Sequence, residues 1–211
     1  MRNRLSSVFA CTMALATVLA LWPATAATAQ SSTTRGFNAA FHLQGAALAV
    51  EGGEADTGGG AGFRVGYGVN RTVTFFLGVD GASISALNVT NVSGIWEMAH
   101  VDLGARFHFA NTLRRWVPYL EVALTGRAAR VGDAIVDGER APVGENVSFN
   151  GGALTLGGGI AVYFSEQFAL DVGLDVSSGQ FTNVSVGAVT VGGLDVDATS
   201  SRFGVGFTYW P

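Results

Sequence analysis

The chain has 211 residues and a formal net charge of −4 at pH 7, and only 13% of its residues are charged. It contains no lysine and no basic run longer than Arg114-Arg115, which argues against nucleic-acid binding. Hydrophobic residues make up 48% of the chain, yet beyond residue 29 no segment approaches the ~18 consecutive apolar residues of a membrane helix. The apolar residues therefore either fill a soluble core or lie along strands that face lipid.

The first 29 residues have the layout of a secretory signal peptide. Two arginines precede a mostly apolar run from Val8 to Leu21, and Ala27-Thr28-Ala29 matches the small-residue cleavage pattern. We expect export through the Sec pathway, cleavage of residues 1–29, and a single mature domain at residues 30–211. This cleavage removes the one cysteine of the chain, so the mature domain has no disulfide.

Eight segments of the mature chain alternate apolar with polar or small residues, which is the period of a strand with two different faces. The last segment is the most regular, with Phe203, Val205, Phe207 and Tyr209 on its apolar face. The pattern predicts an all-β domain of eight strands. In chain order they are expected at residues 37–50, 62–69, 72–82, 96–109, 116–130, 148–164, 168–178 and 199–210.

The connections between these segments alternate between short and long. Strict alternation places tight turns at one rim of a sheet and long loops at the other, which is typical of an outer-membrane barrel. The turns then lie on the periplasmic side and the loops outside the cell. The short connections are residues 70–71, 110–115 and 165–167, and the long ones are residues 51–61, 83–95, 131–147 and 179–198.

The non-apolar face of the predicted strands carries charged residues among glycine, alanine, serine and threonine. No amphipathic helix is left to cover an apolar sheet face, so the sheet is expected to close on itself. Closure with the apolar face outward puts these charges in the lumen, where arginines and carboxylates can pair. Closure the other way makes a soluble barrel, as in lipocalins. The expected lumen network is Arg64, Asp80, Asp102, Arg106, Glu121, Arg127, Asp171, Asp175 and Arg202.

Aromatic residues gather where the predicted strands meet the short turns. Rings with a polar edge favour the membrane interface, so this set predicts an aromatic girdle at the turn side of the barrel. Its members are Tyr67, Phe107, Phe109, Trp116, Phe164, Phe168, Phe207, Tyr209 and Trp210.

With these features the chain resembles the eight-stranded outer-membrane β-barrel superfamily of OmpA/OmpX-like barrels. The sharpest local match is the C-terminal assembly signal of this class, formed here by Arg202, Gly204, Phe207 and Tyr209. The family usually ends on Phe or Trp, whereas here Trp210-Pro211 follow. The resemblance implies a closed antiparallel up-and-down barrel in the outer membrane of a Gram-negative cell. It also implies insertion by the barrel-assembly machinery through the last strand.

Catalytic and metal-binding patterns are weak. Lipid A deacylase barrels resemble this chain in size but carry a His-x-Ser pair, which none of His42, His100 and His108 begins. We expect His100 and His108 to pack in the lumen, because alternation points them inward. The mature chain has no cysteine and no histidines spaced i, i+4, so no metal or cofactor is expected.

The expected function is non-enzymatic: an integral, monomeric outer-membrane barrel with a structural, surface-exposed role. Its partners would be outer-membrane lipid and lipopolysaccharide, and its loops would carry any further contact. The narrow lumen would be filled by side chains, with narrow-pore conductance through Asp102, Arg106, Glu121 and Arg127 as a secondary role. Two alternatives stay open, an outer-membrane lipid-modifying enzyme and a soluble barrel that binds an apolar ligand.

Overall fold

The computed structural model describes residues 34–51, 54–86, 92–109, 115–136, 139–140, 147–186 and 189–211, and the expected signal peptide lies outside them. The regular elements in this part of the chain are all strands. No helix within it is long and apolar enough to cross a membrane. The strands are β1 (Gly36–Val50), β2 (Asp56–Gly68), β3 (Val73–Ala86), β4 (Val92–His108), β5 (Trp116–Val136), β6 (Glu139–Arg140), β7 (Val147–Tyr163), β8 (Phe168–Val186) and β9 (Val189–Tyr209).

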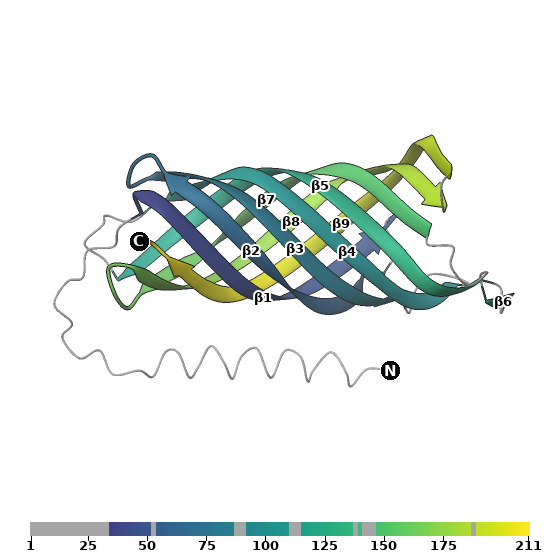
Figure 1. Ribbon diagram of the computed structural model, residues 1–211, viewed down its shortest axis with the longest axis horizontal. Helices are drawn as coiled ribbons and strands as arrows, with labels where there is room; N and C mark the ends of the chain where they lie inside the picture. The colour runs from purple at the N-terminus through teal and green to yellow at the C-terminus, as the bar shows by residue number, and fades with distance from the viewer. Residues whose placement is uncertain are drawn as a thin grey trace.

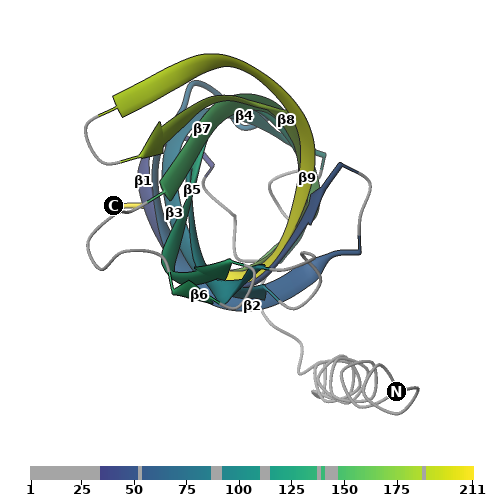
Figure 2. The same ribbon diagram turned by 90° about the vertical axis from the view of Figure 1, so that its right-hand side faces the viewer.

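The strands form one closed antiparallel barrel (Figures 1 and 2). Each long strand pairs with the next one in the chain, and pairing of β1 with β9 closes the ring. The two-residue β6 pairs with β5, inside the β5–β7 connection. The part of the chain that is described thus has eight wall strands, which confirms the predicted eight-stranded up-and-down barrel. Eight strands leave an interior that side chains can fill.

The two ends of the barrel differ, and we call them the turn rim and the loop rim. At the turn rim, Asn70 Oδ1 accepts from the backbone N–H of Thr72 and of Val73, both at 2.8 Å. Ser165 Oγ accepts from the N–H of Phe168 at 2.9 Å. Such side-chain bonds stabilise tight turns. The connections β1–β2, β3–β4, β5–β7 and β8–β9 lie at the loop rim, as predicted.

The strands reach further toward the loop rim than the sequence predicts. The largest error concerns residues 179–198, expected as a loop, where β8 and β9 continue as a hairpin until Val186 pairs with Val189. The pairing register shifts between Phe181 and Asn183, which breaks the period-two alternation that identifies a strand. The other expected loops are also shorter, for a different reason: their ends belong to strands of mostly small or polar residues, which show no clear apolar face.

The middle of the barrel wall carries its apolar side chains outward. Leu103, Leu124 and Leu174 are 62%, 69% and 51% exposed, whereas Arg106 and Arg202 are 9% and 2% exposed. This orientation confirms the inside-out closure and contradicts the soluble barrel, which needs the apolar faces inward. Eight members of the expected aromatic girdle are exposed at the turn rim. They are Tyr67, Phe107, Phe109, Trp116, Phe164, Phe168, Phe207 and Tyr209.

Each end of the lumen holds an apolar cluster, which the sequence analysis did not predict. Toward the loop rim lies a set that we call the loop-rim cluster. Its inward-facing members are Ala46, Leu48, Ala82, Ile84, Met98, Ala129, Phe181 and Ala198. At the other end lies the turn-rim cluster of Val117, Tyr119, Ala161, Tyr163, Ala169 and Trp210. Trp210 was expected in the girdle, but it is 2% exposed because the alternation that turns Tyr209 outward turns Trp210 inward.

Candidate functional site: the charged lumen

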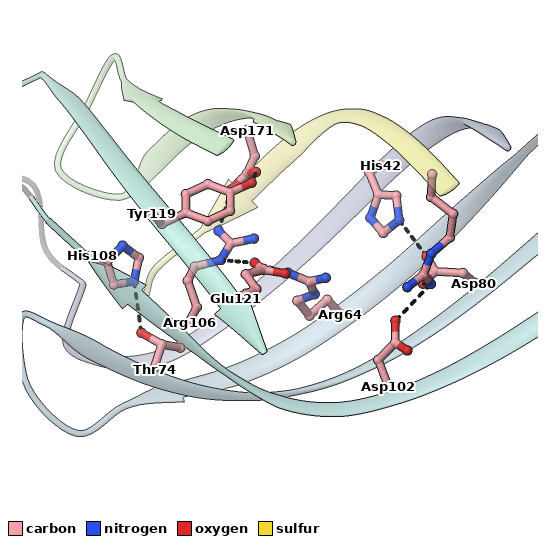
Figure 3. Close-up of polar contacts among 11 residues, drawn as sticks. His42, Arg64, Thr74, Asp80, Asp102, Arg106, His108, Tyr119, Glu121 and Asp171 are labelled. Atoms are coloured by element: carbon pink, nitrogen blue, oxygen red, sulfur yellow. Dashed lines mark hydrogen bonds and ion pairs between the residues drawn. The ribbon is translucent and has the colours of Figure 1, made fainter. Parts of the chain in front are cut away.

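The inward faces of the strands bring the charged side chains together in the lumen in two groups (Figure 3). The group nearer the turn rim is centred on Glu121 of β5, and we call it the turn-side network. Glu121 Oε1 accepts from Arg64 Nη1 at 2.6 Å and from Arg106 Nε. Arg106 Nη1 also donates to Asp171 Oδ2 at 2.6 Å, and the Tyr119 hydroxyl donates to Asp171 Oδ1. Two arginines thus face two carboxylates, and the charges balance.

Aromatic rings hold the two arginines of this network in place. The guanidinium carbon of Arg64 lies 4.0 Å from the centre of the Phe76 ring, and that of Arg106 lies 3.8 Å from the centre of the Tyr119 ring. Cation–π contacts of this kind gain strength where water is excluded. They leave the N–H groups in the plane of the guanidinium free to reach the carboxylates.

The second group, nearer the loop rim, is centred on Arg202 of β9, and we call it the loop-side network. Arg202 Nη1 donates to Asp80 Oδ2 at 2.6 Å and lies 2.8 Å from Asp102 Oδ2. The other oxygens of these carboxylates are also bonded. His42 Nε2 lies 2.6 Å from Asp80 Oδ1, and Thr125 Oγ1 donates to Asp102 Oδ1 at 2.6 Å. Full bonding of this kind offsets much of the cost of burying charge.

A row of hydroxyl groups continues from the loop-side network across the barrel. Thr125 Oγ1 contacts Thr155 Oγ1, which lies 2.6 Å from Ser177 Oγ. Arg202 Nη2 donates to Ser177 Oγ at 3.5 Å, which links the row back to the arginine. The row brings β7, through Thr155, into contact with the inner polar residues of β5 and β8.

Two of the nine expected network residues make no ion pair within the described part of the chain. Asp175 is half-buried between the two networks without a cation within 4 Å. Arg127 is 3% exposed, and its Nε, Nη1 and Nη2 atoms have no hydrogen-bond partner. The expected grouping of Asp102, Arg106, Glu121 and Arg127 is therefore not what the structure shows. Arg106 and Glu121 belong to one network, Asp102 belongs to the other, and Arg127 belongs to neither.

The buried histidines each contact a hydroxyl group. His108 Nε2 lies 3.2 Å from Thr74 Oγ1, and His100 Nε2 lies 3.2 Å from Ser200 Oγ. The second contact joins residues 100 positions apart, so no local motif could have indicated it. Asp102 stands two residues from His100, but its oxygens are taken by Thr125 and Arg202. A catalytic triad needs a carboxylate that orients the histidine, and this carboxylate is already engaged.

Glycine makes room for the loop-side network. A Cβ atom added to Gly62 of β2 would lie 1.8 Å from Asp80 Oδ1 and 2.4 Å from His42 Nε2. Any side chain at this position would therefore displace the pair. The sequence analysis treated the glycines of β2 only as a small-residue face, because nothing local shows what lies opposite them.

The space left in the charged part of the lumen is small. A cavity of about 40 Å³ lies between the networks, lined among others by Arg64, Glu121, Asp175 and Arg202. This volume suits a few water molecules and no substrate. Within the described residues, no group of three or more His, Asp or Glu side chains could hold a metal ion.

The residues of the expected assembly signal lie on both faces of β9. Arg202 points inward as the centre of the loop-side network, and Gly204 lies inward beside the ring of His42. Phe207 and Tyr209 point outward, 58% and 39% exposed, and pair across the seam with Phe41 and Ala39 of β1. The same short motif thus contributes to the lumen and to the apolar exterior.

Residues 14–209 match the family model described as "Outer membrane protein beta-barrel domain". Among solved structures, Neisserial surface protein A is similar with a TM-score of 0.59 and 15% identity, over 82% of this chain and 96% of that one. The Pseudomonas aeruginosa outer membrane protein OprG gives 0.54 and 11%, over 84% and 97%. Ail, the attachment invasion locus protein of Yersinia pestis, gives 0.53 and 13%, over 83% and 100%. No curated protein sequence matches the chain.

Proposed function

Since the chain belongs to the outer-membrane protein β-barrel family, we propose that it is an integral outer-membrane barrel with a structural, surface-exposed role and no enzymatic activity. The observation that carries the proposal is the closed wall with an apolar exterior around an ion-paired interior. The turn rim faces the periplasm and the loop rim faces the outside of the cell. The barrel-assembly machinery inserts the protein through its C-terminal strand. The barrel acts as a monomer in contact with lipid and lipopolysaccharide.

In this proposal the two ion-pair networks hold opposite walls of the barrel together. The turn-side network joins β2, β4, β5 and β8, and the loop-side network joins β1, β3, β4, β5 and β9. Paired charges in a lumen add little net stability, but a wrong strand register would leave charges unpaired. The networks therefore favour the observed strand register over the alternatives.

The lumen serves as a filled support rather than a wide pore. Side chains fill both ends: the loop-rim cluster at one end, and the turn-rim cluster with the buried polar Thr74, His108 and Thr208 at the other. An apolar constriction such as the loop-rim cluster passes ions poorly because water leaves it. Narrow-pore conductance would require these clusters to part and the networks to open together. The loop rim is where partner contacts belong, and the fold shared with an attachment protein such as Ail supports this placement.

The lipid-modifying enzyme is less well supported. Its best candidate among the described residues is the His100–Ser200 pair, with each residue 1% exposed inside the lumen. A lipid substrate approaches from outside the wall, where neither side chain reaches. Replacement of Ser200 by alanine should therefore leave the lipid A of the host cell unchanged, as judged by mass spectrometry of extracted lipid.

Heat-modifiable migration tests the barrel directly. An outer-membrane fraction should contain the protein, and unboiled and boiled samples should run at different positions on a detergent gel, since a closed barrel resists detergent unfolding. Planar-bilayer recordings of the purified barrel should show no steady conductance. Identical migration of the two samples, or recovery of the protein in the aqueous fraction without detergent, would contradict the proposal.

A further inference from the structure

Asp175 of β8 is an acidic residue of the lumen that the ion-pair networks leave over. Its Oδ1 atom lies against Gly157 of β7, where an added Cβ would come within 1.8 Å of it. On its other side it is paired directly opposite Arg202 of β9. Arg202 nevertheless reaches across the lumen to Asp80 and Asp102, and it makes no ion pair with Asp175. A carboxylate in the lumen is costly without a partner, so its position needs an explanation.

Two arginine N–H groups of the lumen also lack a partner. Arg64 and Arg202 use their Nη1 atoms to bond carboxylates, but the Nε atom of each has no hydrogen-bond acceptor among the described residues. The two residues are 9% and 2% exposed, so bulk solvent reaches these N–H groups poorly. Buried groups of this kind are normally bonded to protein or to ordered water.

The unpaired groups border one cavity. Arg64, Asp175 and Arg202 all line the space of about 40 Å³ between the two networks. Gly173 and Gly204 line it as well, and their missing side chains leave it open. One water molecule needs roughly 10–15 Å³ of such space, so the cavity has room for about three.

The donors and acceptors around the cavity select its occupant. The two Nε–H groups need an acceptor, whereas the carboxylate of Asp175 needs a donor. A small anion would lie against Asp175, and a metal cation would meet the two N–H groups. Water both donates and accepts, and a bridging water bonds nearly as well as a direct contact. We propose that the cavity binds a cluster of about three water molecules that links Asp175 to Arg64 and Arg202.

The water cluster makes one hydrogen-bonded unit of the two networks. Arg64 belongs to the turn-side network and Arg202 to the loop-side network, and Asp175 lies between them. A continuous chain of hydrogen bonds then runs from Asp171, through both networks, to Thr155. This water site goes beyond the structural role proposed above, and it gives Asp175 a function in the lumen.

NMR of the arginine side chains tests the proposal directly. The barrel, with isotope-labelled arginine, is studied in phosphatidylcholine nanodiscs. Arg64→Lys and Arg202→Lys assign the two Nε–H signals, because each variant removes one of them. Both signals should show cross-relaxation peaks at the water frequency, whereas the Nε–H of Arg106, which bonds Glu121, should show none. Absence of the water peak from either signal in the folded wild type would overturn the proposal.

Two variants show whether the water lies in this cavity. Gly204→Val adds apolar volume to its lining, where a Cβ meets nothing nearer than 3.6 Å, and should abolish both water peaks. The matched control Gly45→Val adds the same group on the outer face and should leave both peaks. If heat-modifiable migration shows that Gly204→Val does not fold, Asp175→Leu replaces the carboxylate by an apolar side chain and should also abolish both peaks. Water peaks that persist in either folded variant would refute the site.

Discussion

The wall between the turn rim and the middle of the barrel, and the wall near the loop rim, carry opposite polarity. In the first region, apolar side chains such as Leu103 point outward and charges such as Arg106 point inward. In the second, Glu97 and Arg130 are exposed on the outside, while Ile84 and Met98 are buried inside. The same strands run through both regions, so one β-strand can suit lipid along one part of its length and water along another.

The proposed placement in a membrane explains this inversion. A side chain facing hydrocarbon must be apolar, and the narrow lumen then takes the polar residues. Where the wall stands in water, the outer face becomes polar and the inner face forms a small core of the kind found in soluble barrels. The pattern changes near Arg127 on β5, where the loop-rim cluster begins, and we expect the outer boundary of the membrane-spanning part at this level.

The largest effect is expected from removing a shared carboxylate in the membrane-spanning part. Glu121→Gln keeps an acceptor oxygen but removes the negative charge that Arg64 and Arg106 share, at a cost of about 3–5 kcal/mol in the free energy of unfolding. Urea titration of the barrel folded in lipid vesicles measures it. The same change at the exposed Glu97, near the loop rim, should cost no more than ~1 kcal/mol. Equal losses at the two sites would deny the difference between the regions.

A charge added to the outer face should be costly in one region and tolerated in the other. Leu103→Arg places a cation against hydrocarbon and should destabilise the barrel by about 2–4 kcal/mol. Thr182→Arg, on the exposed outer part of β8, should cost about 0–1 kcal/mol. The same vesicle titration measures both variants. If Leu103→Arg proved as stable as Thr182→Arg, Leu103 would not face lipid.

A smaller effect is expected from a single methyl group in the lumen. Gly62→Ala pushes a Cβ into the His42–Asp80 pair and should cost about 1–3 kcal/mol, the usual range for overpacking. Gly45→Ala is the matched control, because its Cβ would meet nothing within 4 Å on the outer face. Urea midpoints of the two variants give the difference. A neutral Gly62→Ala would mean that the pair moves aside at no cost.

The barrel itself could be predicted from the sequence because its signals are local. The alternation of Phe203, Val205, Phe207 and Tyr209 needs only neighbouring residues to be read, and the same holds for the short and long connections. The prediction weakened where the local pattern broke. The register shift between Phe181 and Asn183 concealed the outer hairpin. The girdle prediction also placed Trp210 outward, although its alternation with the outward Tyr209 turns it inward.

What the sequence by itself determined is which side chains face inward from each strand, because alternation is a property of the extended backbone. Only the tertiary structure decided which of them meet. Arg202 contacts Asp80 across 122 residues, whereas Arg127 lies beside Phe181 without a carboxylate. These choices depend on how far each strand is shifted against the next around the closed barrel, and that stagger is a property of the whole ring.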